Sequence, residues 1–413
     1  KARPILLNNW EATYFDFNKD NLIAIAKEAA ELNLDMLVLD DGWFGKRDDS
    51  TSSLGDWYPN EEKLKGTLKE LAEKINAKGL KFGLWIEPEM TNKDSDLYRA
   101  HPDWLLAEQG KRICHSRNQY VLDFSKKEVR EYIGDMLENL LAEVPVSYIK
   151  WDLNRTFSEV FSNGNDREYQ GKVCHKYVLG VYELYERLTS RFPHVLFESC
   201  ASGGARFDPG MLYYAPQGWT SDDTDAIERL KIQYGTSMVY PVSCMGSHVS
   251  ASPNHQTNRV TPIETRADVA YFGTFGYELD LLKLGEEDKA EIRRQIAFMK
   301  EKRDLIQKGT FYRLKSPFEG NETAWMIVSE DQKKALVGYY RVMQPVNVGF
   351  KRLKLKGLKE DICYKVSGYD YDCYGDELMQ VGMILSDSAS GVWKKGVNDK
   401  GDFQAKVFEI VAV

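Results

Sequence analysis

The sequence has 413 residues, which is too long for one small core and suits a barrel-sized domain with an appendage. Its 55 basic and 63 acidic residues give a net charge of −8, and this balance argues against nucleic acid as a partner. The sequence contains no run of 18 apolar residues, so we expect no helix that spans a membrane.

The six cysteines are scattered along the chain, without a CxxC pair and without the spacing of zinc ligands. Scattered thiols are typical of a reduced, intracellular protein, and we therefore expect a cytoplasmic location. The sequence opens on Lys1 rather than on methionine and soon enters an apolar strand. We expect that its natural beginning is missing, which leaves its targeting open.

Strand-like apolar segments alternate with amphipathic helical segments from the first residue to about residue 307. This alternation is the pattern of a parallel α/β fold. The expected strands cover residues 4–9, 35–41, 80–87, 147–152, 195–200, 217–222 and 238–243, with an eighth within 270–280. The expected helices cover residues 21–32, 64–77, 127–141, 172–191, 225–235, 265–273 and 286–307.

Eight such strand–helix units predict a TIM (β/α)8 barrel, and a doubly wound sheet is the alternative. Residues 121–123 are also strand-like, so the strand count is open by one. After Gly309 the pattern changes to short strand-like runs separated by Gly, Asp and Asn, which predicts a smaller antiparallel β-sandwich domain. We therefore expect two domains, a barrel over residues 1–308 and a β domain over 309–413.

Carboxylates and tryptophans recur where the predicted barrel strands end. Functional residues of a TIM barrel gather at these carboxyl ends. Carboxylates bind sugar hydroxyls, tryptophan covers the apolar face of a pyranose, and two carboxylates can act as the acid and the nucleophile of glycoside cleavage. The strand ends that carry this pattern are Trp10, Asp40–Trp43, Trp85–Glu89, Lys150–Asp152, Glu198–Gly204 and Trp219–Asp225.

The strand end at Lys150 and Asp152 is the strongest single candidate. Side chains alternate along a strand, so these two point the same way. A lysine beside an aspartate favours the ionised carboxylate that an attacking group requires. The alternative is an ordinary ion pair that closes a strand.

Other carboxylates have structural interpretations. Asp225, with Glu228 three positions later, has the pattern of a helix cap. Glu87 and Glu89 flank Pro88, so they either close a strand or compete for a catalytic role. Strand alternation does not choose between Asp222 and Asp223, but Asp222 is the last residue of the expected strand.

The sequence contains five long motifs: Leu39–Phe44, Leu84–Met90, Tyr148–Arg155, Glu198–Arg206 and Trp219–Ala226. In this order they strongly resemble family 36 of the glycoside hydrolases, whose members are retaining α-galactosidases of the melibiase and raffinose-cleaving type. The loop Met245–Gln256 is similar as well, and Asn8–Glu11 is a shorter match. The resemblance covers residues 1 to about 307, and the trailing β domain fits the family's architecture.

The resemblance implies roles for individual residues. Asp152 would be the nucleophile and Asp222 the general acid/base. Asp40 and Asp41 would hold the axial 4-hydroxyl and the 6-hydroxyl of galactose. The other implied sugar contacts are Trp10 and Trp85 as walls, Arg117 and Lys150 as hydrogen-bond donors, and Cys200 and Gly203 beside the 2-hydroxyl.

The predicted activity is hydrolysis of terminal α-linked galactose from oligosaccharides by double displacement, without a metal or an organic cofactor. One alternative is a galactosyltransferase of the raffinose-synthase type, and another is a catalytically silent sugar-binding barrel. Family members usually carry an N-terminal β-sandwich before the barrel, and we expect that this sequence lacks it. Activity of the chain alone and homo-oligomeric assembly therefore stay open.

Overall fold

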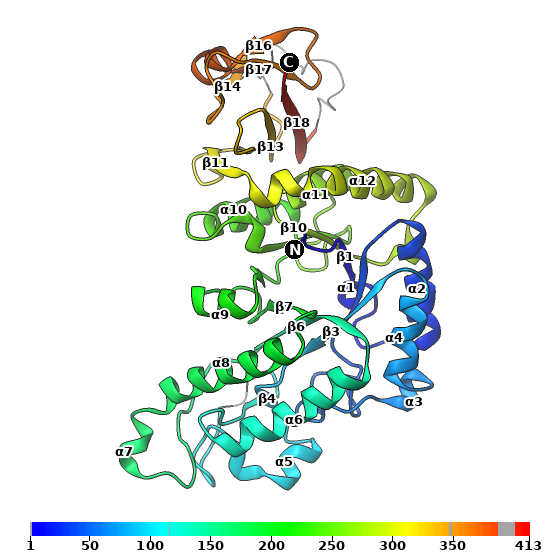
Figure 1. Ribbon diagram of the computed structural model, residues 1–413, viewed down its shortest axis with the longest axis vertical. Helices are drawn as coiled ribbons and strands as arrows, with labels where there is room; N and C mark the ends of the chain where they lie inside the picture. Colours follow the sequence, from blue (N-terminus) through cyan, green and yellow to red (C-terminus); the bar gives the residue numbers. More distant parts are fainter. Residues whose placement is uncertain (1, 115, 347–348, 387–400) are drawn as a thin grey trace. The chain divides into compact units, whose positions relative to one another are not determined.

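The computed structural model describes residues 2–114, 116–346, 349–386 and 401–413, and Figure 1 labels its elements. Eight strands form a closed barrel in the order β1-β10-β9-β8-β7-β6-β3-β2, which confirms the predicted TIM barrel and excludes the doubly wound sheet. The barrel strands are β1 (Leu6–Asn8), β2 (Met36–Leu39), β3 (Lys81–Ile86), β6 (Val146–Trp151), β7 (Leu196–Ser199), β8 (Gln217–Trp219), β9 (Met245–Ser250) and β10 (Thr274–Glu278).

All seven helices predicted for this region are present, with ends that shift by a few residues. Helical spacing of apolar residues accounts for them. In α4, for example, Leu68, Leu71, Ala72 and Ile75 are buried, and the Thr67 hydroxyl caps the first turn. The helices are α2 (Lys19–Glu31), α4 (Leu68–Asn76), α6 (Lys127–Glu143), α8 (Val173–Arg191), α10 (Ala226–Thr236), α11 (Ile263–Ala270) and α12 (Glu286–Lys308).

The prediction of the seventh strand was wrong. Residues 238–243 form a turn that runs into a 3-10 helix, η2 (Val242–Cys244), and the barrel strand follows at β9. Met238 and Val239 are apolar but exposed, whereas β9 is fully buried although it contains Gly, Ser and His. Apolar composition alone therefore selected the wrong segment.

The strand-like residues 121–123 do not add a ninth barrel strand. Tyr120–Val121 form β5, which pairs antiparallel with β4 (Met90–Thr91) in a separate two-stranded sheet. The eighth strand lies within the expected interval, at β10.

The contacts divide the described chain into two compact units. One contains residues 5–222 and 277–284, and the other contains residues 2–4, 223–276 and 285–413. In the first unit, the neighbouring barrel strands β1, β2, β3, β6, β7 and β8 pair in parallel, so their carboxyl ends share one edge. Every residue that the sequence nominated for the sugar site belongs to this unit.

The second unit contains the predicted antiparallel β domain. Six strands pair in the order β11-β12-β13-β18-β15-β16, and a two-stranded sheet joins β14 to β17. Buried side chains of this domain, including Met326, Tyr339, Tyr364 and Phe408, form one hydrophobic core. The strands are β11 (Thr310–Lys315), β12 (Glu322–Val328), β13 (Lys334–Arg341), β14 (Lys351–Leu353), β15 (Cys363–Val366), β16 (Asp372–Tyr374), β17 (Met383–Ser386) and β18 (Gln404–Ala412).

Candidate active site

The ends of the barrel strands place the nominated carboxylates at one edge. Strand β2 ends at Leu39, so Asp40 and Asp41 lie beyond it. Their side chains therefore do not have to point to opposite faces, as consecutive side chains within a strand do. Asp152 directly follows β6, and Cys200 directly follows β7. The predicted strand that ended at Asp222 was too long, because β8 stops at Trp219 and Asp222 lies in the loop after it.

Asp40 is fixed by an ion pair and by two asparagines. Nζ of Lys150 lies 3.0 Å from Oδ2 of Asp40, and Nδ2 of Asn8 donates to the same oxygen over 2.6 Å. The side chain of Asn9 accepts a hydrogen bond from the backbone N–H of Asp40. Burial alone would lower the pKa of Lys150, but the charges of Asp40 and then Glu278 hold it well above its usual value.

Asp41 is held by a guanidinium group. Nε and Nη2 of Arg47 donate to its two oxygens at 3.0 and 2.9 Å, a bidentate geometry that fixes the plane of the carboxylate. Burial raises the pKa of Asp41, and Arg47 opposes that effect. Each oxygen keeps a further lone pair with which to accept a hydroxyl.

Three donors orient the carboxylate of Asp152. Nε1 of Trp85 donates to Oδ2 over 3.2 Å, and Nδ2 of Asn154 donates to the same oxygen over 2.6 Å. The backbone N–H of Leu153 donates to Oδ1 over 2.8 Å. Asp152 is buried, so these three contacts, and not solvent, set the orientation of its carboxylate.

Asn154 connects Asp152 to three further side chains. Its Oδ1 accepts from Nη1 of Arg117 over 3.1 Å and from the hydroxyl of Ser202 over 3.1 Å. Its backbone N–H donates to Oε1 of Glu87. The side chain and the backbone N–H of Asn154 together therefore join the ends of β3, β6 and β7 beside Asp152.

Glu87 and Glu89 are both fully buried, and their contacts differ. Glu89 forms an ion pair with Arg206 at 2.7 Å and accepts hydrogen bonds from Trp151 and Tyr177. Glu87 accepts from Nε2 of Gln119 over 3.0 Å in addition to Asn154. Burial, followed by the charge of Asp152, raises the pKa of Glu87 to about 8.

Asp222 lies next to the loop that contains Cys200 and Gly203. Gly203 has a φ of +80°, and a Cβ placed on it would lie 2.8 Å from the backbone nitrogen of Asp222. Asp222 retains contact with solvent, yet partial removal of its carboxyl group from water and the charge of Asp152 raise its pKa to about 6. Burial, followed by the charge of Asp152, also raises the pKa of the Cys200 thiol well above its usual value.

The two nominated tryptophans differ in exposure. Trp85 is buried and stacks on Phe44 with 6.2 Å between ring centroids. Trp10 is half-buried in the short helix α1 (Trp10–Thr13), edge-on to Tyr14 and Phe15. Its backbone N–H donates to Asn8, the asparagine that binds Asp40.

Arg47 and Asn154 hold Asp41 and Asp152 in place, and the sequence did not predict either role. Arg47 lies six positions after Asp41, outside the matched motif, and carries no signal of its own in the sequence. Asn154 lies inside the motif Tyr148–Arg155, so its position beside Asp152 was a signal that could have found it.

No group of three or more His, Cys, Asp or Glu side chains that could hold a metal ion occurs among the described residues. In the same part of the chain, no helix is long and apolar enough to cross a membrane.

Comparison with known families gives two matches. The family model described as Melibiase matches residues 1–309, and the Glycosyl hydrolase family 36 C-terminal domain matches residues 322–410. Alpha-galactosidase AgaA of Geobacillus stearothermophilus is 54% identical over 398 residues, which cover 95% of this chain and 54% of that protein. Alpha-galactosidase Mel36A of Lactobacillus acidophilus is 47% identical over 100% of this chain and 55% of its own length.

Solved structures show the same likeness. A variant of AgaA in complex with raffinose has a TM-score of 0.96 and 51% identity, over 100% of this chain and 56% of that one. An alpha-galactosidase from Lactobacillus brevis has a TM-score of 0.96 and 46% identity, over 100% and 55%. The chain thus spans about half the length of the proteins it matches.

Proposed function

The chain belongs to glycosyl hydrolase family 36, and on that premise we propose that it acts as a retaining exo-α-galactosidase. The substrates would be oligosaccharides of the melibiose and raffinose type that end in α-linked galactose. Structures of AgaA variants in complex with raffinose and with stachyose support this substrate class.

One observation carries the proposal, namely the unequal environments of Asp152 and Asp222 within one unit. Three donors orient Asp152, whereas the pKa of Asp222 is raised to about 6. A carboxylate that three donors hold in one orientation and a carboxyl group whose pKa is raised are suited to different roles in glycoside cleavage.

In the first step, Asp152 attacks the anomeric carbon while Asp222 protonates the leaving oxygen. In the second step, Asp222 takes a proton from water, which attacks the galactosyl–Asp152 ester and releases galactose with net retention. Because the same carboxyl group gives and then takes a proton, a pKa near the working pH serves both steps.

The remaining nominated residues would bind galactose. Asp40 and Asp41, each held by a cation, would accept the 4- and 6-hydroxyls. Trp10 and Trp85 would cover the sugar. The other proposed contacts are Arg117 and Lys150 as donors and Cys200 with Gly203 at the 2-hydroxyl.

We also keep the domain division as a proposal, with the barrel over residues 1–308 and the β domain over 309–413. The change from helix to antiparallel strands after α12 supports it. Expression of residues 1–308 alone, followed by thermal unfolding, tests whether the barrel folds without the β domain.

Release of galactose from a chromogenic α-galactoside tests the proposed activity. The silent sugar-binding alternative predicts binding without release. Sucrose as acceptor separates hydrolysis from galactosyl transfer, because a raffinose-synthase type of enzyme would form the trisaccharide. Proton NMR of the first product tests the mechanism, since early β-galactose would exclude a covalent galactosyl–Asp152 intermediate.

A further inference from the structure

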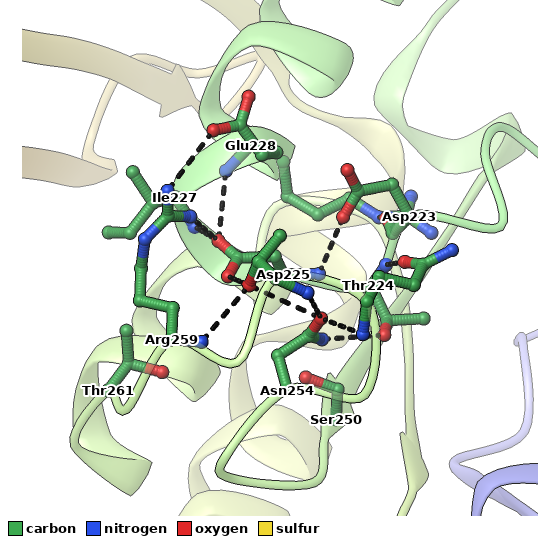
Figure 2. A network of polar contacts seen from close by, with 12 residues as sticks. Asp223, Thr224, Asp225, Ile227, Glu228, Ser250, Asn254, Arg259 and Thr261 are labelled. Atoms are coloured by element: carbon green, nitrogen blue, oxygen red, sulfur yellow. Dashed lines mark hydrogen bonds and ion pairs between the residues drawn. The ribbon is translucent and has the colours of Figure 1, made fainter.

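The peptide segment that follows Asp222 is anchored by a network that the proposed mechanism does not use. Figure 2 shows this network around Asp225, at the start of α10. We propose that Asp225 is a positioning residue, which ties the loop of residues 251–262 to α10 and so fixes the backbone that carries Asp222. This inference rests on the proposed function, because it assigns Asp222 the acid/base role.

The carboxylate of Asp225 makes four contacts and is 1% exposed. Its Oδ1 caps α10 by accepting from the backbone N–H groups of Ile227 (2.8 Å) and Glu228 (3.2 Å). Oδ2 accepts from the hydroxyl of Thr257 over 2.5 Å, and Nη1 of Arg259 donates to Oδ1. The last two partners belong to the loop, so one side chain joins the helix and the loop.

The loop binds the same segment at a second point. Nδ2 of Asn254 donates to the hydroxyl of Thr224 over 3.1 Å. The backbone N–H of Thr224 donates to Oε1 of Gln256 over 3.3 Å. Asn254 also accepts from the backbone N–H groups of Gln256 and Thr257, which hold the loop in shape.

A buried arginine fixes the residue directly after Asp222. Nε of Arg229 donates to the backbone oxygen of Asp223 over 2.7 Å, and its Nη1 donates to the backbone oxygen of Gly246 in β9 over 3.1 Å. The side chain of Asp223 accepts from the backbone N–H of Asp225. Residues 223, 224 and 225 are thus each anchored, and the next residue along the chain is Asp222.

A helix cap alone requires fewer contacts. Asp208 caps α9 (Pro209–Tyr214) in the same way, by accepting from the N–H groups of Gly210 and Met211. Asp225 adds a charged partner, Arg259, whose guanidinium lies 5.7 Å from the ring centroid of Phe403. These additional contacts are those expected if Asp225 holds the loop as well as the helix.

The test compares Asp225→Asn with Asp208→Asn. Asparagine is as good a cap as aspartate, so both variants keep their helices. Asp225→Asn removes the nearer of the two carboxylates that bind Arg259 and leaves Glu228, whose Oε1 lies 3.4 Å from Nη2 of Arg259. We expect its kcat on raffinose to fall about tenfold or more, because small displacements of a proton donor are costly, with little change in KM.

An aryl galactoside with an activated leaving group provides the readout specific to positioning. Such a leaving group requires little protonation, so Asp225→Asn should lose less than about threefold on it. Asp208→Asn should keep its activity on both substrates. Equal losses on the two substrates, or no loss on raffinose, would overturn the positioning role.

Trypsin gives a measurement that does not depend on activity. The bond after Arg259 leads to the exposed Val260, and a loop released from Asp225 should be cut there faster. We expect fragments that begin at Val260 to appear faster in Asp225→Asn than in the wild type or Asp208→Asn. The three proteins are compared at a temperature well below the melting temperature of each. Unchanged cleavage would show that Asp225 does not tie the loop to α10, even if the wild type hydrolyses no galactoside. Faster cleavage in the variant together with an inactive wild type would overturn the proposed function and the positioning role built on it.

Discussion

Lys150, on β6, forms an ion pair with Asp40, which follows β2, although β3 lies between these two strands. Sequence alternation had placed Lys150 beside Asp152, yet its ammonium group reaches across to the other carboxylate. Both side chains are less than a tenth exposed. This desolvated pair fixes the carboxylate that we assign to the galactose hydroxyls.

Removing one partner of this pair should cost stability. Lys150→Met leaves the buried carboxylate of Asp40 without its cation, and we expect the free energy of unfolding to fall by about 3–5 kcal/mol. Urea denaturation measures the loss. The double variant Asp40→Asn with Lys150→Met should recover part of it, and a loss that is simply additive would show that the pair is not coupled.

The pH dependence of the reaction should follow Asp222. The general acid must be protonated to act, and the pKa of Asp222 is about 6. We therefore expect kcat/KM on raffinose to fall as the pH rises through about 6, with a much weaker fall on an activated aryl galactoside. Identical pH profiles for the two substrates would contradict this assignment.

Asp222→Ala should lose most activity on a poor leaving group and keep far more on an activated aryl galactoside. Added azide should speed its turnover and give α-galactosyl azide, because a small anion attacks the β-linked galactosyl–Asp152 intermediate from the opposite face without help from a base. Asp223→Ala is the matched control and should show neither pattern. If azide rescues Asp223→Ala instead, the acid/base assignment is wrong by one residue.

Gly203→Ala should reduce activity through the position of Asp222. A methyl group at Gly203 would lie 2.5 Å from Cα of Ser221 and 2.8 Å from the nitrogen of Asp222, so the backbone has to shift. We expect kcat on raffinose to fall on the order of 100-fold.

Gly164→Ala separates this effect from backbone strain. Gly164 has a similar φ of +82°, but no atom lies within 4 Å of the added methyl group. We expect Gly164→Ala to lose only the melting temperature that the positive φ costs, Gly203→Ala to lose more because of the added contacts, and kcat to fall in Gly203→Ala alone. Equal kcat values would exclude the contact with the backbone of Asp222 as the cause.

The sequence predicted the barrel because its strands and helices follow different apolar periods. It failed at β9, where Gly246, Ser247 and His248 are buried in a strand that is only partly apolar. Burial there follows from the closed barrel, which brings both faces of the strand against other elements. A single segment read along the chain does not contain that information.

The candidate site was predictable where its residues lie at strand ends, because the parallel strands of a barrel bring their carboxyl ends to the same edge. Partners chosen across the barrel were not predictable. The pairing of Lys150 with Asp40 and of Arg47 with Asp41 depends on side-chain reach and on where β2 stops. Local alternation gives a direction for a side chain but not its partner.

Glu87 offers a prediction about stability. Its pKa is about 8 in the folded protein, against a usual value of 4.5. Between these two pH values the folded state holds a proton that the unfolded state lacks, so the wild type should lose stability as the pH rises from about 4.5 to 8. Glu87→Gln does not titrate and should lack this loss.

The substituted amide has a partner available. Oε1 of Gln119 is buried without a hydrogen-bond partner in the described structure, and its Nε2 donates to Glu87. Rotation of the Gln119 amide would present that oxygen to the new NH2 group at position 87. We therefore expect Glu87→Gln to fold.

Urea denaturation at pH 5 and pH 8 tests this expectation. The free energy of unfolding of Glu87→Gln, taken relative to that of the wild type, should rise by up to a few kcal/mol from pH 5 to pH 8. Glu89→Gln is the control, because it leaves the Arg206 guanidinium without its ionised partner and should lower stability at both pH values. If Glu87→Gln instead becomes relatively less stable at pH 8, Glu87 is ionised in the folded protein, and its carboxylate holds Asn154 beside Asp152 as a charged group.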